Sequence, residues 1–395
     1  MDIFNSRFYR TNCFFLKLLG LWPLGDVSNN RIKRVTVVSL VVSLIIPMVI
    51  KLVQEWGNDI DIVIEVIGSL IYLSGSQLKY ISCASVQSQI KFLYTEIERH
   101  WNTLTNEEEK KILKQYARDG YNLSFGYLML LNVILVGYLL VPFTPMLLDL
   151  IDPLNETRPK AFPYFAEYFI DNQKYYFELT VHGWIICILS VQIYGTFDAT
   201  YTQLVQHSCA LFAIVEYRLG QATKMVASDE DSSHKDTDKV AYNMMVGAIN
   251  YHKQAIQFVG LIEKCYSLLS FLIIILNTAV VSLAAVVTML HIEKGNQKQA
   301  IRIGMLYVAF SFHLLYNSYP GQKVIDSSTR IQEAAFHCEW FNTSSKTKQL
   351  IKIIMLRSMV PCTLTAKTLV VLDLESFAFV FKKSISYITV IGSMR

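Results

Sequence analysis

The sequence predicts an all-α membrane protein with seven transmembrane helices, a cytoplasmic N-terminus and an extracellular C-terminus. First, the 395 residues are 52% hydrophobic and only 17% charged, a composition typical of a polytopic membrane protein. Second, seven long apolar stretches each approach the ~20 residues that a helix needs to cross the hydrocarbon core. Third, most of the 36 Lys and Arg residues lie in the N-terminal segment and in the second, fourth and sixth gaps between these stretches. Excess positive charge marks the cytoplasmic side.

The seven predicted spans follow one another with gaps of unequal length. They are Val35–Val53, Ile62–Ser85, Leu123–Leu148, Tyr175–Asp198, Tyr266–Leu290, Ala300–Ser318 and Leu374–Ser393. Before the first span, the apolar run Phe14–Pro23 is too short for a cleavable signal peptide and ends in Trp22 and Pro23. It predicts a helix in the inner membrane interface, with Trp22 at the level of the lipid headgroups.

The third gap, residues 149–174, is predicted to be extracellular and rich in packed aromatic side chains. It contains Asn155-Glu156-Thr157, a sequon that predicts N-glycosylation of Asn155. None of the seven cysteines falls in an outside gap, so no extracellular disulfide is expected.

Two cytoplasmic gaps are predicted to be partly helical. In the fourth gap, apolar residues recur at helical spacing on both sides of a polar loop, Ser228–Lys239. In the sixth gap, Leu350–Val360 is too short and too charged to span a bilayer, and predicts a cytoplasmic amphipathic helix. If this segment did span, the C-terminus would be cytoplasmic.

Enzyme, metal and nucleic-acid functions find no support in the sequence. HExxH, GxSxG, GxGxxG and Walker A motifs are absent, and the histidines have no recurring ligand spacing. The net charge of +4 follows from the cytoplasmic gaps. No catalytic residue, cofactor, metal or nucleic-acid partner is expected.

The last span carries the most unusual charges, Lys382 and Lys383. A charge at the bilayer centre costs at least ~2.5–3.5 kcal/mol on insertion scales. Either this helix lines water, or the span begins near Lys382. Lys383, Ser386, Val390 and Ser393 form one polar stripe with Ser376, which predicts an ion path with Val390 as a hydrophobic gate. A packed helix shows the same kind of pattern.

Aromatic and hydroxyl side chains in the outer halves of spans two to six predict a pocket for a small, volatile, weakly polar ligand. The candidate ligand-binding residues are Tyr72, Ser76, Tyr138, Val181, Trp184, Ile188, Tyr307 and Phe310. Ordinary packing between helices is the alternative for each of them.

Short motifs also run along most of the chain. They are Leu18 to Pro23 (LLGLWP), Tyr176 to Thr180 (YFELT), Phe197-Asp198, His207, Arg218-Leu219, Tyr319 to Gln322 (YPGQ), Ser327 to Ala335, Trp340, Arg357 to Pro361 (RSMVP), Leu364 to Ala366 (LTA), Phe377 and Lys383 to Tyr387 (KSISY). In these residues the chain resembles an insect odorant receptor.

The resemblance implies a ligand-gated, non-selective cation channel that assembles as a heterotetramer with a shared co-receptor. It implies that span seven lines the pore with Val390 at the gate, and that an odorant binds in the outer half of spans two to six. Since the co-receptor has a longer fourth gap and Gln in place of Ser393, the chain resembles a tuning subunit. The implied location is the plasma membrane of olfactory dendrites.

The resulting organisation has six parts. They are 1–34, a cytoplasmic segment with the interfacial helix; 35–198, helices one to four with the ligand-binding region; 199–265, a cytoplasmic helical anchor; 266–318, helices five and six; 319–373, further anchor helices; and 374–395, the pore-lining helix. The alternative is a chemoreceptor of the seven-helix G-protein-coupled type, which requires a cytoplasmic C-terminus. A DRY-like triplet and an NPxxY motif are absent.

Overall fold

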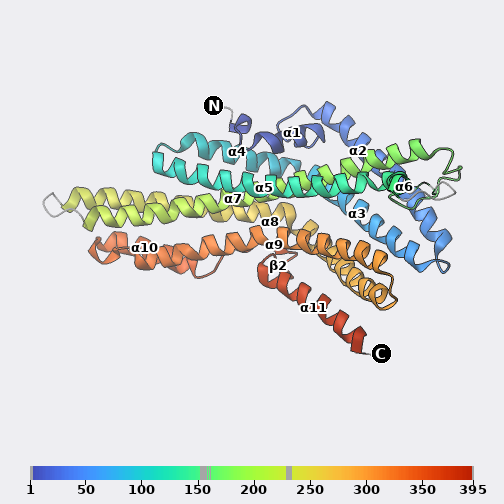
Figure 1. The fold of residues 1–395 in the computed structure, drawn as a ribbon. Helices are drawn as coiled ribbons and strands as arrows, with labels where there is room; N and C mark the ends of the chain where they lie inside the picture. Colours follow the sequence, from blue (N-terminus) through green and yellow to red (C-terminus); the bar gives the residue numbers. More distant parts are fainter. Residues whose placement is uncertain (1–2, 152–157, 159, 161, 228–233, 394–395) are drawn as a thin grey trace. The chain divides into compact units, whose positions relative to one another are not determined.

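The computed structural model describes residues 3–151, 158, 160, 162–227 and 234–393, which are almost entirely helical (Figure 1). The α-helices are α1 (Arg10–Leu18), α2 (Val27–Glu55), α3 (Ile60–Ser85), α4 (Gln87–Thr103), α5 (Glu107–Leu139), α6 (Thr144–Ile151), α7 (Tyr176–Ala227), α8 (His234–Glu293), α9 (Gln297–His337), α10 (Ser345–Ser358) and α11 (Leu374–Ser393). Three 3-10 helices, η1 (Ile3–Asn5), η2 (Val141–Phe143) and η3 (Trp340–Asn342), and the strands β1 (Thr365–Ala366) and β2 (Val370–Val371) complete the described elements.

The predicted spans correspond to α2, α3, α5, α7, α8, α9 and α11. Within the described residues, five segments are long and apolar enough to cross a membrane: Ser28–Glu55, Ile60–Ser85, Glu107–Met146, Tyr176–Val226 and Thr237–Glu293. The predicted sixth and seventh spans are helical over their whole length, in α9 and α11. The all-α fold class is therefore confirmed.

The third predicted span does not form one helix to its end. Helix α5 stops at Leu139, the chain passes through η2, and α6 begins at Thr144. Pro142 and Pro145 lie in this stretch. Proline has no N–H to continue the helical hydrogen bonds and disfavours helical geometry in the residue before it. The expectation of a single helix to Leu148 was wrong for this reason.

The helices that flank the fourth gap are much longer than a bilayer requires. Helix α7 has 52 residues and α8 has 60, whereas ~20 residues cross the hydrocarbon core. This confirms the helical flanks, but α8 begins at His234, so the second half of the predicted loop Ser228–Lys239 is helical. Residues 228–233 lie outside the described part of the chain. Helix α10 confirms that the sixth gap contains a helix, which runs over Ser345–Ser358 rather than Leu350–Val360.

The chain divides into two compact units. The α2–α3 unit comprises Phe4–Gln87 and Leu123–Thr200, and the α8–α9 unit comprises Met1–Ile3, Ser88–Asn122 and Tyr201–Arg395. The core of the α2–α3 unit consists of side chains from α2, α3, α7 and the segment before α7. They are Val41, Leu44, Met48, Val66, Leu73, Tyr164 and Ile186.

Within the α8–α9 unit, α8 packs against α9, α10 and α11. The β1–β2 hairpin precedes α11 and is held by α8: the hydroxyl of Thr365 bonds the carboxylate of Glu263, and the amide N–H of Lys367 donates to Ser267 Oγ at 2.8 Å. The turn uses Lys367 and Thr368 at positive φ, 53° and 59°. Neither residue type favours that conformation, so the turn had no recognisable signal in the sequence.

The hairpin also brings backbone onto α9. A Cβ on residue 321 would lie 1.7 Å from the carbonyl oxygen of Leu372. Only glycine fits there without a shift of one backbone against the other. This contact explains why Gly321 follows Pro320 in the middle of α9.

Two sequence features have unexpected surroundings. Trp22 is 7% exposed, and its ring packs against Phe4 at a centroid distance of 5.5 Å. Its side chain is therefore packed within the protein, and its placement at the level of the lipid headgroups stays a prediction. None of the seven cysteines is exposed: five are buried, and Cys187 and Cys338 are half-buried.

Candidate functional site

The α2–α3 unit brings two predicted ligand-binding residues of α3 against α7. The ring of Tyr72 stacks on Tyr194 at 5.0 Å with an interplanar angle of 13°, and the Tyr194 hydroxyl donates to the Tyr72 carbonyl at 3.2 Å. One turn further along α3, Ser76 is fully buried, and its Oγ lies 3.5 Å from Ser190 Oγ. Tyr72 and Ser76 therefore share an α3–α7 contact.

Tyr138, Trp184 and Val181 are half-buried in the same unit. The Tyr138 hydroxyl donates to the carbonyl of Pro163 at 3.0 Å and lies beside the thiol of Cys187. The indole N–H of Trp184 is buried without a hydrogen-bond partner among the described residues. A buried donor of this kind is costly unless water or a ligand satisfies it.

The remaining predicted ligand-binding residues are elsewhere. Ile188 is 42% exposed on α7, so it lies apart from the buried side chains of this region. Tyr307 and Phe310 belong to α9 in the α8–α9 unit. The ring of Tyr307 stacks on Phe381 of α11 at 6.1 Å, and its hydroxyl lies 3.3 Å from Ser384 Oγ.

A buried ion pair lies next to the Tyr72–Tyr194 stack. Lys79 of α3 bonds Asp198 of α7, with side-chain exposures of 1% and 0%. Tyr127 of α5 donates its hydroxyl to Asp198 Oδ2 at 3.0 Å, and the Lys79 ammonium lies 4.6 Å from the centroid of the Tyr194 ring. The ion pair and the hydrogen bond from Tyr127 together join α3, α5 and α7.

Lys79 lies within the predicted second span, Ile62–Ser85, but no sequence pattern identifies its partner. An intramembrane charge faces the bundle and pairs with an opposite charge. Asp198, at the end of the predicted fourth span, is one of the carboxylates within the predicted spans, as are Glu65 and Glu178. Tyr127 and Tyr194 carried no comparable signal.

The predicted pore-lining face of α11 is partly described. Lys382, Lys383 and Ser386 are exposed, and the Lys383 ammonium lies 5.6 Å from the centroid of the exposed Phe379 ring. Ser384, on another face, is buried. The side chains of Val390 and Ser393 lie outside the described residues, as does Asn155. In the α8–α9 unit, the face of α11 that contains both lysines is uncovered.

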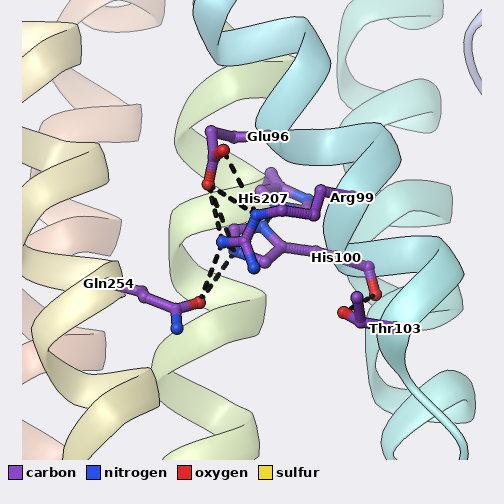
Figure 2. A network of polar contacts seen from close by, with 6 residues as sticks. All are labelled: Glu96, Arg99, His100, Thr103, His207 and Gln254. Carbon is purple, nitrogen blue, oxygen red and sulfur yellow. Dashed lines mark hydrogen bonds and ion pairs between the residues drawn. The ribbon is translucent and has the colours of Figure 1, made fainter.

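A histidine pair connects α4, α7 and α8 in the α8–α9 unit (Figure 2). His100 Nδ1 lies 2.9 Å from His207 Nε2, and the two rings stack at 5.2 Å. His100 Nε2 lies 3.1 Å from Gln254 Oε1 and 3.0 Å from Arg99 Nη2, while Arg99 forms an ion pair with Glu96.

Both histidines are expected to be neutral. Burial and the adjacent Arg99 guanidinium lower the pKa of His100. Burial, followed by the proximity of His100, lowers the pKa of His207 well below its ordinary value. In the neutral pair, one ring nitrogen donates a hydrogen bond and the other accepts it. The role of this pair is to join helices, and no group of three metal-ligating side chains occurs in the described part of the chain.

A second polar contact in this unit involves another motif residue. The guanidinium of Arg218 binds both oxygens of Glu109, at 2.6 and 2.8 Å, and lies 4.0 Å from the centroid of the Tyr251 ring. Bidentate pairs of this kind are geometrically specific. Arg218 and His207 thus fix the packing of α7 against α4, α5 and α8.

Comparison with known proteins gives a consistent result. The profile of the family described as "7tm Odorant receptor" matches residues 62–385. Putative odorant receptor 92a of Drosophila melanogaster is 26% identical over 160 residues, 40% of this chain and 37% of that protein. The odorant receptor coreceptor of Aedes aegypti is 24% identical over 156 residues, 38% of this chain and 32% of that protein. These matches span less than half the length of the relatives.

Solved structures match over nearly the whole chain. The olfactory receptor OR5 from Machilis hrabei superposes with a TM-score of 0.73 at 12% identity, and covers 98% of this chain and 97% of its own. The same receptor in complex with eugenol gives a TM-score of 0.70 at 13% identity, with the same coverage of both chains. At this identity the likeness concerns the fold.

Proposed function

Because the chain belongs to the odorant receptor family, we propose that this multi-pass membrane protein is a subunit of an odorant-gated, non-selective cation channel. In this proposal, a small volatile ligand binds among the transmembrane helices. Binding favours the open state of a pore lined by α11, because the ligand has a higher affinity for that state. The chain acts with a co-receptor subunit in a heterotetramer at the plasma membrane of olfactory neurons.

The observation that carries the channel proposal is the uncovered face of α11. Lys382 and Lys383 are both exposed there, in a helix that is otherwise mostly apolar. A lysine in contact with lipid tails is unfavourable by several kcal/mol, on the order of 2.5–3.5 on insertion scales. Water in a central pore, enclosed by several subunits, would keep both ammonium groups hydrated. This supports α11 as the pore wall.

The proposed ligand site lies in the α2–α3 unit. Tyr72, Tyr138 and Trp184 supply aromatic walls, and Ser76 and the unpartnered Trp184 N–H supply polar groups. The related receptor bound to eugenol favours a small aromatic or weakly polar ligand. Tyr307, Phe310, Val181 and Ile188 remain candidates from the sequence alone.

The partner and the domain organisation are part of the same proposal. Similarity to the odorant receptor coreceptor of Aedes aegypti supports a common architecture for both kinds of subunit. We place 199–265 and 319–373 in a cytoplasmic anchor between subunits, 374–395 at the pore, and a glycan on Asn155 at the outer surface.

Whole-cell recording tests the function directly. The chain is expressed alone and together with the co-receptor, and current is measured during odorant pulses with G-protein signalling blocked. We expect odorant-evoked cation current with the co-receptor and none, or much less, without it. Current that disappears when G-protein signalling is blocked would support a chemoreceptor of the G-protein-coupled type.

Substitutions on α11 test the pore separately. Lys383→Gln removes a positive charge from the proposed ion path, so we expect higher relative permeability to divalent cations. Val390→Ala places a smaller side chain at the proposed hydrophobic gate, so the constriction should widen and the resting leak current should increase. Lys352→Gln on α10, which also removes an exposed lysine, is the matched control. If ion permeability and resting leak were unchanged in both α11 variants, the proposal that α11 lines the pore would be refuted.

A further inference from the structure

We propose that the exposed face of α1 is a docking surface for the anionic lipid headgroups of the cytoplasmic leaflet. The inference rests on the proposed membrane orientation, in which the N-terminus is cytoplasmic. It adds a lipid class and a set of contact residues to that orientation. The contact residues are Arg10, Phe14, Lys17 and Leu18.

The four contact residues lie on one side of α1. Their spacing of four, three and one is that of a single helical face. Phe14 is 59% exposed and Leu18 is 56% exposed, and Arg10 and Lys17 are exposed beside them. The opposite side of the helix is buried through Asn12, Cys13 and Leu16. Exposed apolar side chains bordered by cations are typical of a helix that lies in a membrane interface.

The charge of the whole segment complements an anionic surface. Residues 1–34 contain six basic and two acidic side chains. The basic residues are Arg7, Arg10, Lys17, Arg31, Lys33 and Arg34. Of the two acidic residues, Asp2 and Asp26, Asp26 accepts a hydrogen bond from the N–H of Ser28 at the start of α2. Juxtamembrane basic clusters of this density bind the negatively charged cytoplasmic leaflet.

Contacts with α2 place α1 at the membrane boundary. Lys33 Nζ donates to the carbonyl of Lys17 at 2.9 Å, and Arg34 Nε donates to the carbonyl of Gly20 at 2.9 Å. Lys33 lies two residues before Val35, the first residue of the predicted first span. With a helical rise of about 1.5 Å per residue, the C-terminal end of α1 is within roughly one turn of the hydrocarbon core.

The lipid-facing side of α2 continues from this level across the membrane. Its exposed apolar residues recur at helical spacing. They are Ile32, Val35, Val42, Ile46, Val49 and Val53. The exposed face of α1 thus lies at the level where a lipid-exposed helix leaves the hydrocarbon core.

The surface is also preformed. Asn12 Nδ2 donates to Thr200 Oγ1 at 2.9 Å, Tyr80 donates its hydroxyl to the carbonyl of Leu19 at 2.7 Å, and Gln87 Nε2 donates to the carbonyl of Leu21 at 2.8 Å. These bonds tie Asn12 of α1 to α7, and the residues that follow α1 to Tyr80 of α3 and Gln87 at the start of α4. Docking on lipid therefore requires no folding of the helix, unlike binding by a free amphipathic peptide.

Fluorescence quenching in nanodiscs tests the location of α1. The Phe14→Trp variant is compared with Phe92→Trp, in which the replaced residue is 52% exposed on α4, and the signal of the parent chain is subtracted. We expect lipids brominated close to the headgroup to quench the added Trp at 14 strongly and the added Trp at 92 weakly. Quenching of Trp at 14 by aqueous iodide alone, or by neither quencher, would overturn the proposal in favour of a solvated or protein-covered face.

A second experiment tests the preference for anionic lipid. Thermal unfolding is measured in nanodiscs of phosphatidylcholine with and without phosphatidylserine. We expect phosphatidylserine to raise the midpoint of the parent chain, and the Arg10→Glu/Lys17→Glu variant to lose most of this increase. The Lys91→Glu/Lys346→Glu control changes the net charge equally at two other exposed residues and should keep it. If phosphatidylserine raised the unfolding midpoint equally in the two double variants, the preference for anionic lipid would be refuted.

Both readouts are independent of odorant and current. A chain that fails as a channel subunit would still give the expected quenching if α1 docks on lipid. Conversely, a working channel with an unquenched Trp at 14 would refute only the docking surface.

Discussion

Lys79 and Asp198 form an ion pair that is closed to solvent: their side chains are 1% and 0% exposed. The pair is supported by a hydrogen bond from Tyr127 and by the rings of Tyr194 and Phe197 around the ammonium group. A buried charge without its partner is far more costly than a buried pair.

The first prediction concerns the loss of one partner. Lys79→Met or Asp198→Asn should each lower the stability of the purified protein by about 3–5 kcal/mol. The first leaves the carboxylate of Asp198 buried without its counter-charge, and the second leaves the ammonium group of Lys79 so. The double variant Lys79→Met/Asp198→Leu should recover part of that loss. Thermal unfolding in detergent measures all three.

The control for this pair is Lys51→Met. Lys51 pairs with Glu55 on the same helix at exposures of 22% and 21%, and such pairs contribute on the order of 0–1 kcal/mol. If Lys79→Met were no more destabilising than Lys51→Met, the buried pair would have no structural importance.

Gly321 gives a steric prediction. Gly321→Ala should sharply reduce the yield of folded protein, because the new Cβ would lie 1.7 Å from the Leu372 carbonyl oxygen. Gly260→Ala in α8 is the matched control, since nothing lies within 4 Å of its Cβ position and alanine favours helix by up to ~1 kcal/mol. Size-exclusion profiles of the two variants make the comparison. Equal yields would contradict the close approach of α9 and the hairpin.

The Tyr72–Tyr194 stack leads to a prediction about odorant sensitivity. Tyr194→Leu removes the ring that holds Tyr72 in place. Aromatic pairs contribute about 0.5–1.5 kcal/mol beyond their buried area, so we expect a two- to about tenfold rise in the odorant concentration for half-maximal current. Ile185→Ala, at a residue 49% exposed on the same helix, should leave it unchanged. An unaltered response in Tyr194→Leu would exclude the stack from the ligand site.

The histidine pair predicts a pH dependence of stability. The pKa of each histidine is lowered in the folded protein, from an ordinary value of 6.5. Above pH 6.5 both folded and unfolded states are neutral at these residues. As the pH falls below 6.5, the unfolded chain binds protons that the folded pair does not, so stability decreases.

The decrease is limited to about 1.4 kcal/mol per pH unit for each histidine. His207→Gln removes one of the two and should flatten the fall of the thermal midpoint between pH 7 and pH 5. His337→Gln, at an exposed residue of α9, should retain the steep fall. Parallel curves for the two variants would refute this origin of the acid sensitivity.

The fold was largely predictable because helices in a membrane need long apolar sequences. The first and second spans, and the helical flanks of the fourth gap, follow from hydropathy and periodicity alone. Pro142 and Pro145 signal the break after Leu139 in the sequence. The prediction of one span to Leu148 followed the length of the apolar stretch instead. Helix α4 was missed because its apolar residues occur among many polar ones.

The site was less predictable, because it depends on which residues of different helices meet. Lys79 was recognisable as a charge in a span, whereas its contact with Tyr194 depends on the rotation of α7 against α3. Ile188 illustrates the converse: it shares the apolar character of Val181 and Trp184 but points to the exterior of the unit. The residue types that line a ligand pocket are the same as those that pack between helices, so residue type alone does not distinguish them.

The absence of any exposed native cysteine has a practical consequence for spectroscopy. Because no native thiol is exposed, a single cysteine introduced at an exposed residue, such as Lys346 or Phe92, should react with a maleimide dye ahead of the native thiols. Distance measurements between such dyes could then follow the movement of individual helices during odorant binding. The natural chain can serve as its own labelling background.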